Sequence, residues 1–302
     1  MKKTTIKCQC CGAESFYSLK VPQIKEDKYG VNFGTNEPSE WKVCLGCGLV
    51  FQNPRFKQED IEKFYENSSY RDENYPSDAD IRYSKRIFTR FEKIFNDDFG
   101  LDIHNIKNAN ILDFGCAIGG SFEFIKKHNN IYGIELDKKL RDYANKHFDI
   151  KAYDRLEKIS DIQFDIIFTN NVLEHVYDPN EFFEFVKTNL KPSGILVIVL
   201  PTYKFGEHPA TILHFNYAHN IMVDHVSLSN WLNNYSLHMS DYRYIRQVHG
   251  MELVSLSVKS KNKNNYDFKL SEIKKEIEEN LINRVQENFS LRWITGKDSI
   301  EY

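Results

Sequence analysis

The sequence predicts an α/β fold built on a parallel β-sheet, with a small cysteine-rich unit before it. Residues 110–120, NILDFGCAIGG, indicate a buried strand, a glycine turn and the start of a helix, SFEFIKKH. A second short strand ends at Glu135, 22 residues after Asp113, where a carboxylate can accept hydrogen bonds from both hydroxyls of a ribose. Two Cys-x-x-Cys-Gly pairs lie near the start of the chain. Together these observations predict a Rossmann-like nucleotide-binding sheet preceded by a metal-binding ribbon.

The glycine turn also indicates the kind of nucleotide. A dinucleotide-binding turn follows the pattern G-x-G-x-x-G, with a third glycine close to the pyrophosphate, whereas this chain has Asp-Phe-Gly-Cys-Ala-Ile-Gly-Gly. Asp113 would repel a pyrophosphate, but it could hold an ammonium group directly or through water. The pattern therefore favours a cationic cofactor without phosphates, S-adenosylmethionine.

Four motifs between residues 110 and 201 resemble those of the class I S-adenosylmethionine-dependent methyltransferases. In order they are DFGCAIGG, GIELD, FDIIFTNNVLEHVYDP and LKPSGILVIVLP. The chain departs from the family at Ala117, where a further glycine is usual, and a methyl group is small enough for binding to survive. The resemblance implies a cofactor site formed by Asp113, Gly115, Cys116, Ala117, Gly119, Glu135 and Leu136. The alternative is an ordinary Rossmann-like domain whose acidic residues only cap helices or face water.

Two later segments extend the predicted cofactor site. In IKAYDRLEKI a third strand is followed by Asp154, Arg155 and Leu156, at the place where related enzymes hold the adenine. The fourth strand, FDIIFTN, ends at Asn170 and Asn171. We expect these two residues to face the methionine part of the cofactor, because open α/β sheets bind ligands at the carboxyl ends of their strands.

Length and composition predict a soluble globular protein with more than one structural unit. The chain has 302 residues, 41% of them hydrophobic, and no window approaches the ~20 apolar residues of a membrane-spanning helix. The start, MKKTTIKCQCCG, has no apolar run after its lysines, so we expect a cytoplasmic protein without a membrane partner. The net charge is −3, with basic and acidic residues interleaved, and this pattern does not favour a nucleic-acid partner.

Five of the six cysteines lie in the first 47 residues and indicate a structural zinc site. Cys8 and Cys11 form one CxxCG turn, and Cys44 and Cys47 form the other. Each turn lets two thiolates converge on one tetrahedral ion, and the glycine permits a left-handed backbone. Four thiolates leave no open position, so we expect this zinc to have no catalytic role. Free thiols or a redox pair would not explain two matching turns, although Cys10 could replace Cys8 as a ligand.

The motifs divide the chain into four segments. Residues 1–55 are predicted to form the zinc-binding ribbon, and residues 56–104 a helical linker or lid with helices at 57–68 and 80–99. The cofactor-binding domain spans 105–265, and 266–302 form a C-terminal helix and tail whose partner is this domain or a second subunit of a homo-oligomer. In the family that the motifs resemble, the segment before the first motif covers the cofactor. Tyr65, Tyr70, Arg71 and Tyr75 are therefore candidate lid residues. The alternative is that they pack between helices at the surface.

Histidines are concentrated after the fifth strand, where this fold places the substrate. They are His208, His214, His219 and His225. Their spacing does not put all of them on one helical face and includes no HExxH-like pair, so a second metal site is not favoured. A neutral imidazole could instead accept the proton of a hydroxyl during methyl transfer.

His225 is the first choice for this general base, followed by His214 and Tyr217. The segment VDHVSLSNWL resembles the HEHxxYFS region of zinc-ribbon sugar methyltransferases, and the resemblance aligns His225 with the second histidine. Val223 replaces the first histidine, which argues against a carbon acceptor and favours oxygen. The alternative role for His225 is to cap the following helix. His175, expected one turn into the helix after the fourth strand, matches a common family residue and is a fourth candidate, or else a structural partner.

The favoured function is therefore methyl transfer from S-adenosylmethionine to an oxygen of a small molecule, with a histidine as the general base. A sugar or sugar nucleotide of surface-polysaccharide or natural-product biosynthesis is the expected acceptor. An RNA methyltransferase with a zinc-ribbon reader would need basic residues on the ribbon, where few occur. A carbon or nitrogen acceptor is less favoured than oxygen. A non-catalytic zinc-dependent interaction module is the least favoured function, because the cofactor motif is intact.

Overall fold

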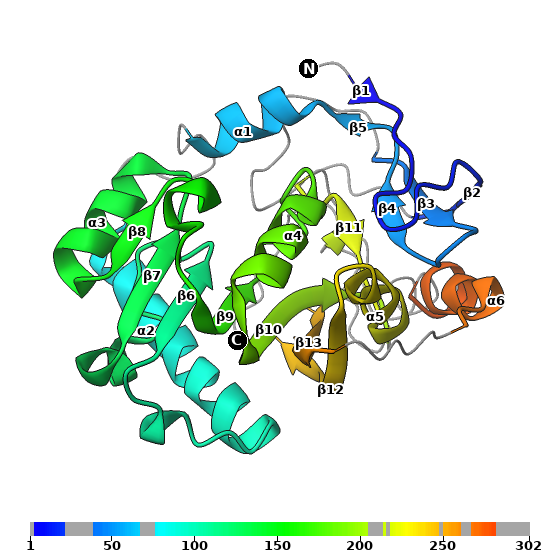
Figure 1. Ribbon diagram of the computed structural model, residues 1–302. Coiled ribbons are helices and arrows are strands. Elements are labelled where there is room, and N and C mark those ends of the chain that lie inside the picture. The colour runs from blue at the N-terminus through cyan, green and yellow to red at the C-terminus, as the bar shows by residue number, and fades with distance from the viewer. Residues whose placement is uncertain are drawn as a thin grey trace.

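The computed structural model describes residues 3–21, 39–66, 76–204, 214–215, 218–247, 250–260 and 267–281. A seven-stranded sheet forms its centre, with helices on both faces (Figure 1). The strands of this sheet are β6 (Asn110–Phe114), β7 (Asn130–Ile134), β8 (Lys151–Tyr153), β9 (Phe164–Asn170), β10 (Leu190–Thr202), β12 (Leu237–Gln247) and β13 (Gly250–Lys259). The predicted α/β, Rossmann-like sheet is thus confirmed.

The strand order is β12-β13-β10-β9-β6-β7-β8. The strands from β8 to β10 are mutually parallel, whereas β13 is antiparallel to both β10 and β12. Chain order reverses direction between β6 and β9, so the carboxyl ends of these two strands lie side by side and open a crevice there. Strand β13 covers the segment MELVSLSVK, and β12 is its neighbour at the edge of the sheet.

The helices differ from the predicted ones mainly at their ends. The α-helices are α1 (Gln58–Glu66), α2 (Asp78–Lys93), α3 (Lys138–Phe148), α4 (Pro179–Asn189), α5 (His225–Asn233) and α6 (Leu270–Lys274). The predicted helix over 80–99 consists of α2 and a π-helical turn at Ile94–Asp98, and a second π-helical turn, Lys275–Leu281, extends α6. The segment after the glycine turn forms a 3₁₀-helix, Glu123–His128, instead of an α-helix.

The fourth-strand motif contains a further difference. Glu174 and His175 lie in a turn instead of inside a helix, and α4 begins only at Pro179. Asp178 caps this helix by accepting a hydrogen bond of 3.0 Å from the backbone amide of Asn180. Proline in the first helical turn and aspartate before it are strong start signals, so the helix begins there and leaves the preceding residues to the crevice.

The apolar core lies on both faces of the sheet, because successive side chains of a strand point to opposite faces. On one face, Ile111 and Val197 belong to a cluster with aromatic residues of α2 and the turn after it, such as Phe91 and Phe95. On the other face, Leu112 packs in a cluster with Phe182 of α4 and other residues of α4 and α5. Among the described residues, no helix is both long and apolar enough to cross a membrane.

The N-terminal ribbon is joined to the rest of the chain through a shared sheet. The short strands β1 (Lys3–Thr4) and β5 (Arg55–Phe56) pair with each other. A separate, four-stranded sheet has the order β11-β4-β3-β2. Its strands are β2 (Phe16–Ser18), β3 (Trp41–Cys44), β4 (Val50–Gln52) and β11 (Ile221–Met222). Strand β11 comes from the segment that follows the fifth strand of the central sheet. The predicted substrate segment is therefore paired directly with the ribbon.

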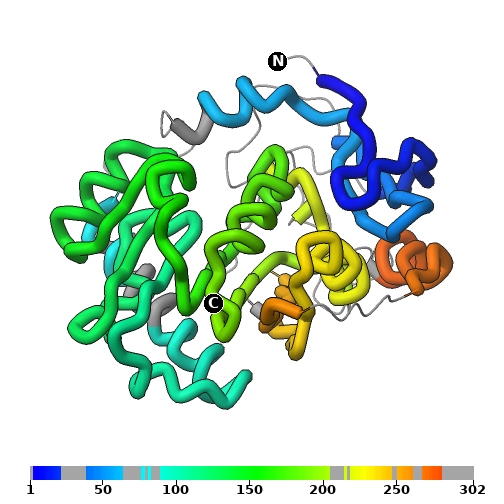
Figure 2. Tube along the Cα trace, in the orientation of Figure 1, coloured from blue at the N-terminus to red at the C-terminus, as the bar shows by residue number. Residues whose placement is uncertain are grey.

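The C-terminal helix also packs on the ribbon. Ile273 and Ile277 belong to a buried cluster with Trp41 and Val43 of β3. In Figure 2 the blue ribbon and the orange helix lie side by side. Within the described residues, this helix therefore packs on its own chain, on the ribbon.

Candidate cofactor cavity and metal sites

A cavity of about 990 Å³ lies at the carboxyl ends of β6, β7 and β9. It is lined by eleven of the twelve predicted cofactor residues: Asp113, Gly115, Cys116, Ala117, Glu135, Leu136, Asp154, Arg155, Leu156, Asn170 and Asn171. The twelfth, Gly119, is not part of the lining; a Cβ atom there would lie 3.0 Å from Cβ of Ala144, so this glycine allows the turn to approach α3. The fold thus places predicted residues from four strand ends around one cavity.

The glycine turn is shaped by close packing under the cavity. Gly115 has a φ of 82°, and a Cβ atom on it would lie 2.2 Å from a methyl group of Val172, so no side chain fits. The amides of Gly115 and Cys116 both donate to the carbonyl of Ile134, which ties the turn to β7. Ala117 has a φ of 46°. The residue that departs from the family pattern therefore occupies a backbone conformation that favours glycine.

Glu135 is held rigidly at the mouth of the cavity. Its two carboxylate oxygens accept hydrogen bonds from the amides of Ala117, at 3.0 Å, and Asp137, at 2.9 Å. Arg141 donates to the carbonyls of Glu135 and Leu136 and fixes the same turn from outside. A carboxylate oxygen accepts more than one hydrogen bond, so this geometry is compatible with additional bonds from a ribose.

Asp113 is buried below the turn, with 4% of its surface exposed. Burial raises the pKa of this carboxyl to about 7; a hydrogen bond from Ser121 opposes the shift and the charge of Glu135 adds to it. A cation bound beside Asp113 would stabilise its ionised form.

Two amide oxygens at the end of β9 provide a test of the cofactor's fit. Oδ1 of Asn170 and Oδ1 of Asn171 are buried without a hydrogen-bond partner among the described residues. Asn171 has a φ of 52°, and its Nδ2 donates to Glu252, which is paired with Arg90 of α2. Buried acceptors usually have donors, and the ammonium group of a methionine tail could supply them. Arg90 and Glu252 were not predicted, because they lie on distant elements and no local pattern marks them.

Part of the predicted lid contacts the cavity. Ile61 and Glu62 of α1 and Phe91 of α2 are among the lining residues. Figure 1 shows α1 leading from the ribbon towards the end of the central sheet. The side chain of Tyr65 and the whole of Tyr70, Arg71 and Tyr75 lie outside the described residues.

Of the four predicted general bases, His175 is the one that lines the cavity within the described part of the chain. Its Nδ1 lies 2.9 Å from the carbonyl oxygen of Ala218, and burial lowers its pKa to about 4, so the ring is neutral at pH 7. The ring of His219 lies 4.8 Å from that of His175, and the ring of His214 lies 5.9 Å from that of His219. Tyr217 lies outside the described residues.

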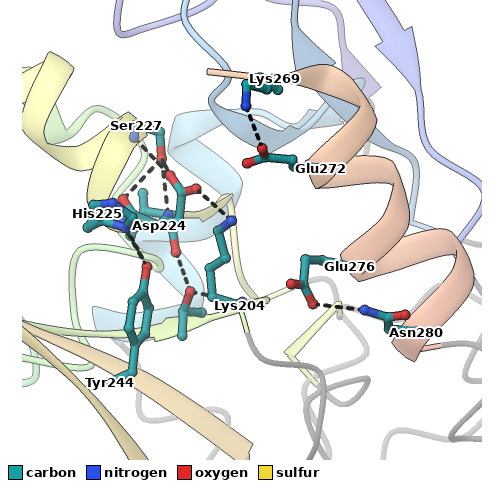
Figure 3. A network of polar contacts seen from close by, with 11 residues as sticks. Lys204, Asp224, His225, Ser227, Tyr244, Lys269, Glu272, Glu276 and Asn280 are labelled. Carbon is teal, nitrogen blue, oxygen red and sulfur yellow. Dashed lines mark hydrogen bonds and ion pairs between the residues drawn. The ribbon is translucent and has the colours of Figure 1, made fainter. Parts of the chain in front are cut away.

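His225 lies outside the lining of the cavity, at the start of α5 (Figure 3). Its Nδ1 is 2.9 Å from the hydroxyl of Tyr244, and its ring stacks on Tyr242. The helix cap is formed by Asp224, whose side chain accepts a hydrogen bond from the amide of Ser227. In return, the hydroxyl oxygen of Ser227 accepts a hydrogen bond from the amide of Asp224. The alternative role considered for His225, capping α5, is therefore performed by its neighbour, which also lies near Lys204.

The four predicted metal ligands form one cluster. The sulfur atoms of Cys8, Cys11, Cys44 and Cys47 lie within 4.8 Å of one another. Gly12 and Gly48 have φ angles of 76° and 79°, as predicted for the two turns. Four sulfurs around a zinc ion are about 3.8 Å apart, so the cluster fits a tetrahedral zinc. Cys10 is buried but is not part of this group.

The strand order, the glycine turn and the cavity at the β6–β9 crevice define the fold of class I S-adenosylmethionine-dependent methyltransferases. Residues 83–241 match the family described as a methyltransferase domain, and the chain belongs to this family.

Curated relatives cover part of the chain. A ubiquinone biosynthesis O-methyltransferase of Coxiella burnetii (strain RSA 493 / Nine Mile phase I) is 29% identical over 126 residues, which are 39% of this chain and 54% of the relative. Phosphoethanolamine N-methyltransferase 3 of Arabidopsis thaliana is 24% identical over 180 residues, 51% of this chain and 36% of the relative. The chain thus spans about half the length of the first of these relatives and about a third of the second.

Solved structures share the fold. Magnesium protoporphyrin IX methyltransferase (ChlM) from Synechocystis PCC 6803, solved with bound SAH, has a TM-score of 0.50 and 11% identity, with 68% of this chain and 100% of that chain covered. The 1,6-didemethyltoxoflavin-N1-methyltransferase of Burkholderia thailandensis also has a TM-score of 0.50, with 13% identity and coverages of 70% and 96%. At these identities the likeness concerns the fold alone.

Proposed function

We propose that this protein transfers a methyl group from S-adenosylmethionine to an oxygen of a small molecule, with a sugar or sugar nucleotide as the acceptor. The main support for S-adenosylmethionine as the cofactor is the chemistry of the cavity lining. It presents the carboxylates of Asp113 and Glu135 and the buried amide oxygens of Asn170 and Asn171. All of these groups accept hydrogen bonds, which suits a cofactor with a ribose and an ammonium group and does not suit a phosphate.

The proposed binding mode assigns each end of the cavity a part of the cofactor. Glu135 accepts from the ribose hydroxyls, and Asp113 and Asn170 hold the methionine end. Leu136, which is 36% exposed at the mouth, and Leu156 provide apolar surface for the adenine. Asp154 could accept from the exocyclic amine of the same ring. This arrangement directs the sulfonium towards the segment that contains His175.

The reaction needs alignment and the loss of one proton. The acceptor oxygen attacks the methyl carbon in line with the sulfur, so the new O–C bond forms as the S–C bond breaks and the electron pair passes to sulfur. The hydroxyl proton leaves during this step, and a neutral imidazole is suited to take it. His175 lines the cavity and is the proposed base. The roles of the other sequence-based candidates, His225, His214 and Tyr217, remain predictions.

The four-cysteine cluster is proposed to hold a structural zinc ion. Four thiolates satisfy the tetrahedral ion, so zinc would stabilise the ribbon and supply no open position for a substrate. About one zinc ion per chain is expected in this cluster by metal analysis.

Calorimetric titration with S-adenosylmethionine and S-adenosylhomocysteine tests the cofactor. The Glu135→Ala variant should weaken binding by at least about tenfold, because the ribose would lose a charged acceptor worth roughly 1.5–3 kcal/mol. Glu123→Ala, which removes an exposed carboxylate of the same domain, is the matched control and should bind normally. Unchanged affinity of a folded Glu135→Ala variant would contradict the assignment.

A methyl-transfer screen then tests the acceptor. Nucleotide-linked sugars and RNA are compared with labelled S-adenosylmethionine. Transfer to a sugar oxygen supports the proposal, whereas transfer to RNA alone would favour the ribbon as an RNA reader. No cofactor binding by folded, zinc-loaded protein would point to an interaction module with a degenerate fold.

A further inference from the structure

A carboxylate and two imidazoles converge beside the cofactor cavity. Glu174 and His175 lie in the turn after β9, and His219 lies just before β11. Each side chain offers one ligand atom, and the three atoms lie within 4.8 Å of one another. Ligand atoms around a metal ion at 2.0–2.2 Å are about 3–4 Å apart, so small rotations of the side chains close the site. The sequence alone did not favour a site here, because these residues come from two distant segments.

Backbone groups orient both imidazoles in the way that metal sites require. Nδ1 of His175 lies 2.9 Å from the carbonyl oxygen of Ala218, and Nδ1 of His219 lies 2.8 Å from that of His214. A ligating histidine usually donates its second ring N–H to a carbonyl or carboxylate, which fixes the ring and its tautomer. The two bonds therefore assign Nε2 as the ligating atom of each ring.

Asn220 joins the two segments that carry the cluster. Its amide donates to the carbonyl of Glu174, and its Nδ2 donates to the carbonyls of His175 and Val176 at 3.0 and 3.2 Å. The ligands are thus held by a network of main-chain contacts before any ion binds.

The buried carboxylate of Glu174 independently indicates a bound cation. Only 1% of this residue is exposed, and its Oε2 has no hydrogen-bond partner among the described residues. Its Oε1 lies 3.8 Å from Nε2 of His175, which is too long for a hydrogen bond. A buried carboxylate is costly unless a cation or several donors compensate it. An ion between the three side chains would supply that compensation.

We propose that Glu174, His175 and His219 bind one divalent first-row transition-metal ion at the wall of the cofactor cavity. Two histidines and one carboxylate are a ligand set that proteins use for catalytic metals, and three protein ligands leave positions open. Because His175 lines the cavity, these open positions adjoin the space where the acceptor would lie.

The role of this ion rests on the proposed function, whereas the site itself does not. A hydroxyl bound to the ion loses its proton to water more readily, and its oxygen then attacks the methyl carbon while the S–C bond breaks. Two open positions would take two adjacent hydroxyls of one acceptor, which is a pattern that sugars carry. With the ion bound, His175 acts as a metal ligand, and activation of the hydroxyl by the ion replaces the general-base role that the proposed function gives to this residue.

Titration of the 302-residue, zinc-loaded protein with Mn²⁺ tests the site. Free Mn²⁺ is counted by electron paramagnetic resonance after the zinc content of the sample has been measured. Mn²⁺ prefers oxygen and nitrogen ligands and competes poorly for thiolates, so the four-cysteine cluster does not interfere. We expect one Mn²⁺ site per chain in the unaltered protein.

Two ligand variants and one control define the location. Glu174→Gln and His219→Ala should each weaken Mn²⁺ binding by at least about 100-fold, since loss of an outer partner alone costs about 10–100-fold. His104→Ala removes an exposed histidine bonded to Glu92 and should bind Mn²⁺ normally. Absence of a site in the unaltered protein would overturn the proposal, as would a site that survives both ligand substitutions.

Titration of the same samples with S-adenosylmethionine separates this proposal from the proposed function. Cofactor binding without a Mn²⁺ site overturns the metal site and leaves methyl transfer intact. If Glu174→Gln fails to fold, as judged by circular dichroism, the partly exposed His219 and its conservative variant His219→Gln carry the test.

Discussion

Asp113 shows how one residue can report on cofactor binding. Its pKa is raised to about 7 by burial, so near neutral pH the unliganded protein holds a mixture of protonated and ionised Asp113. The ammonium group of S-adenosylmethionine would favour the ionised form, so the pKa should fall on binding and a proton should be released. Affinity is therefore expected to rise by about fivefold to tenfold from about pH 6 to about pH 7.5.

Calorimetry in two buffers with different enthalpies of ionisation measures this proton release directly. Asp113→Asn should bind more weakly and lose the pH dependence, because the amide does not titrate in this range. An affinity that is equal at both pH values, with no proton exchanged, would place the ammonium group elsewhere.

The glycine turn is the element on which the cofactor site depends most. Gly115→Ala would press a Cβ atom against Val172 and should lower the affinity for S-adenosylmethionine at least about tenfold, with a loss of about 1–3 kcal/mol of stability. Ala117→Gly relieves a left-handed alanine in the same turn and should leave the fold equally or more stable, with binding retained.

Thermal unfolding and cofactor titration of this pair provide matched data, because each variant changes one methyl group. Equal effects of the two substitutions would contradict the account of the turn.

Elements were predictable where a strong local pattern coincides with burial. Strands β6, β7 and β9 are largely apolar runs, and the sequence predicts both the strands and the polar residues at or next to their carboxyl ends, Asp113, Glu135 and Asn170. Strand β12 was missed because half of its residues are polar and it lies at the sheet edge. The turn at Glu174 differs from the predicted helix because the signals that start α4, Asp178 and Pro179, come later in the chain.

Contacts between distant segments could not be predicted. The contacts of Glu252 with Arg90 and Asn171 form only because β13, α2 and the residue after β9 come together in the fold. The approach of His219 to His175 likewise depends on where the segment before β11 joins the ribbon. Neither leaves a periodic signal in the chain.

The ribbon contacts the wall of the cofactor cavity through hydrogen bonds to Tyr177. Arg55, at the end of the ribbon, is 1% exposed; its Nη2 donates to the carbonyl of Tyr177 at 2.7 Å, and its guanidinium lies 3.9 Å above the Tyr177 ring. Gln9, between Cys8 and Cys11, donates to the same carbonyl and accepts from Arg55. Asn180 of α4 donates to the carbonyl of Gln9. Tyr177 lines the cavity, so the first cysteine turn and the cavity share a partly buried network of hydrogen bonds.

Removal of the zinc ion proposed for the four-cysteine cluster should therefore weaken cofactor binding, although the four cysteines do not line the cavity. Arg55→Lys keeps the charge but loses the planar fork that bonds Tyr177 and Gln9 together, so we expect a several-fold lower affinity for S-adenosylmethionine with zinc content unchanged. Lys7→Ala removes an exposed ribbon cation paired with Glu14 and should have no effect. Zinc removal by a chelator should reduce affinity at least as much as Arg55→Lys, because it releases Gln9 as well. Full cofactor affinity in zinc-free, folded protein would show that the ribbon and the cavity act independently.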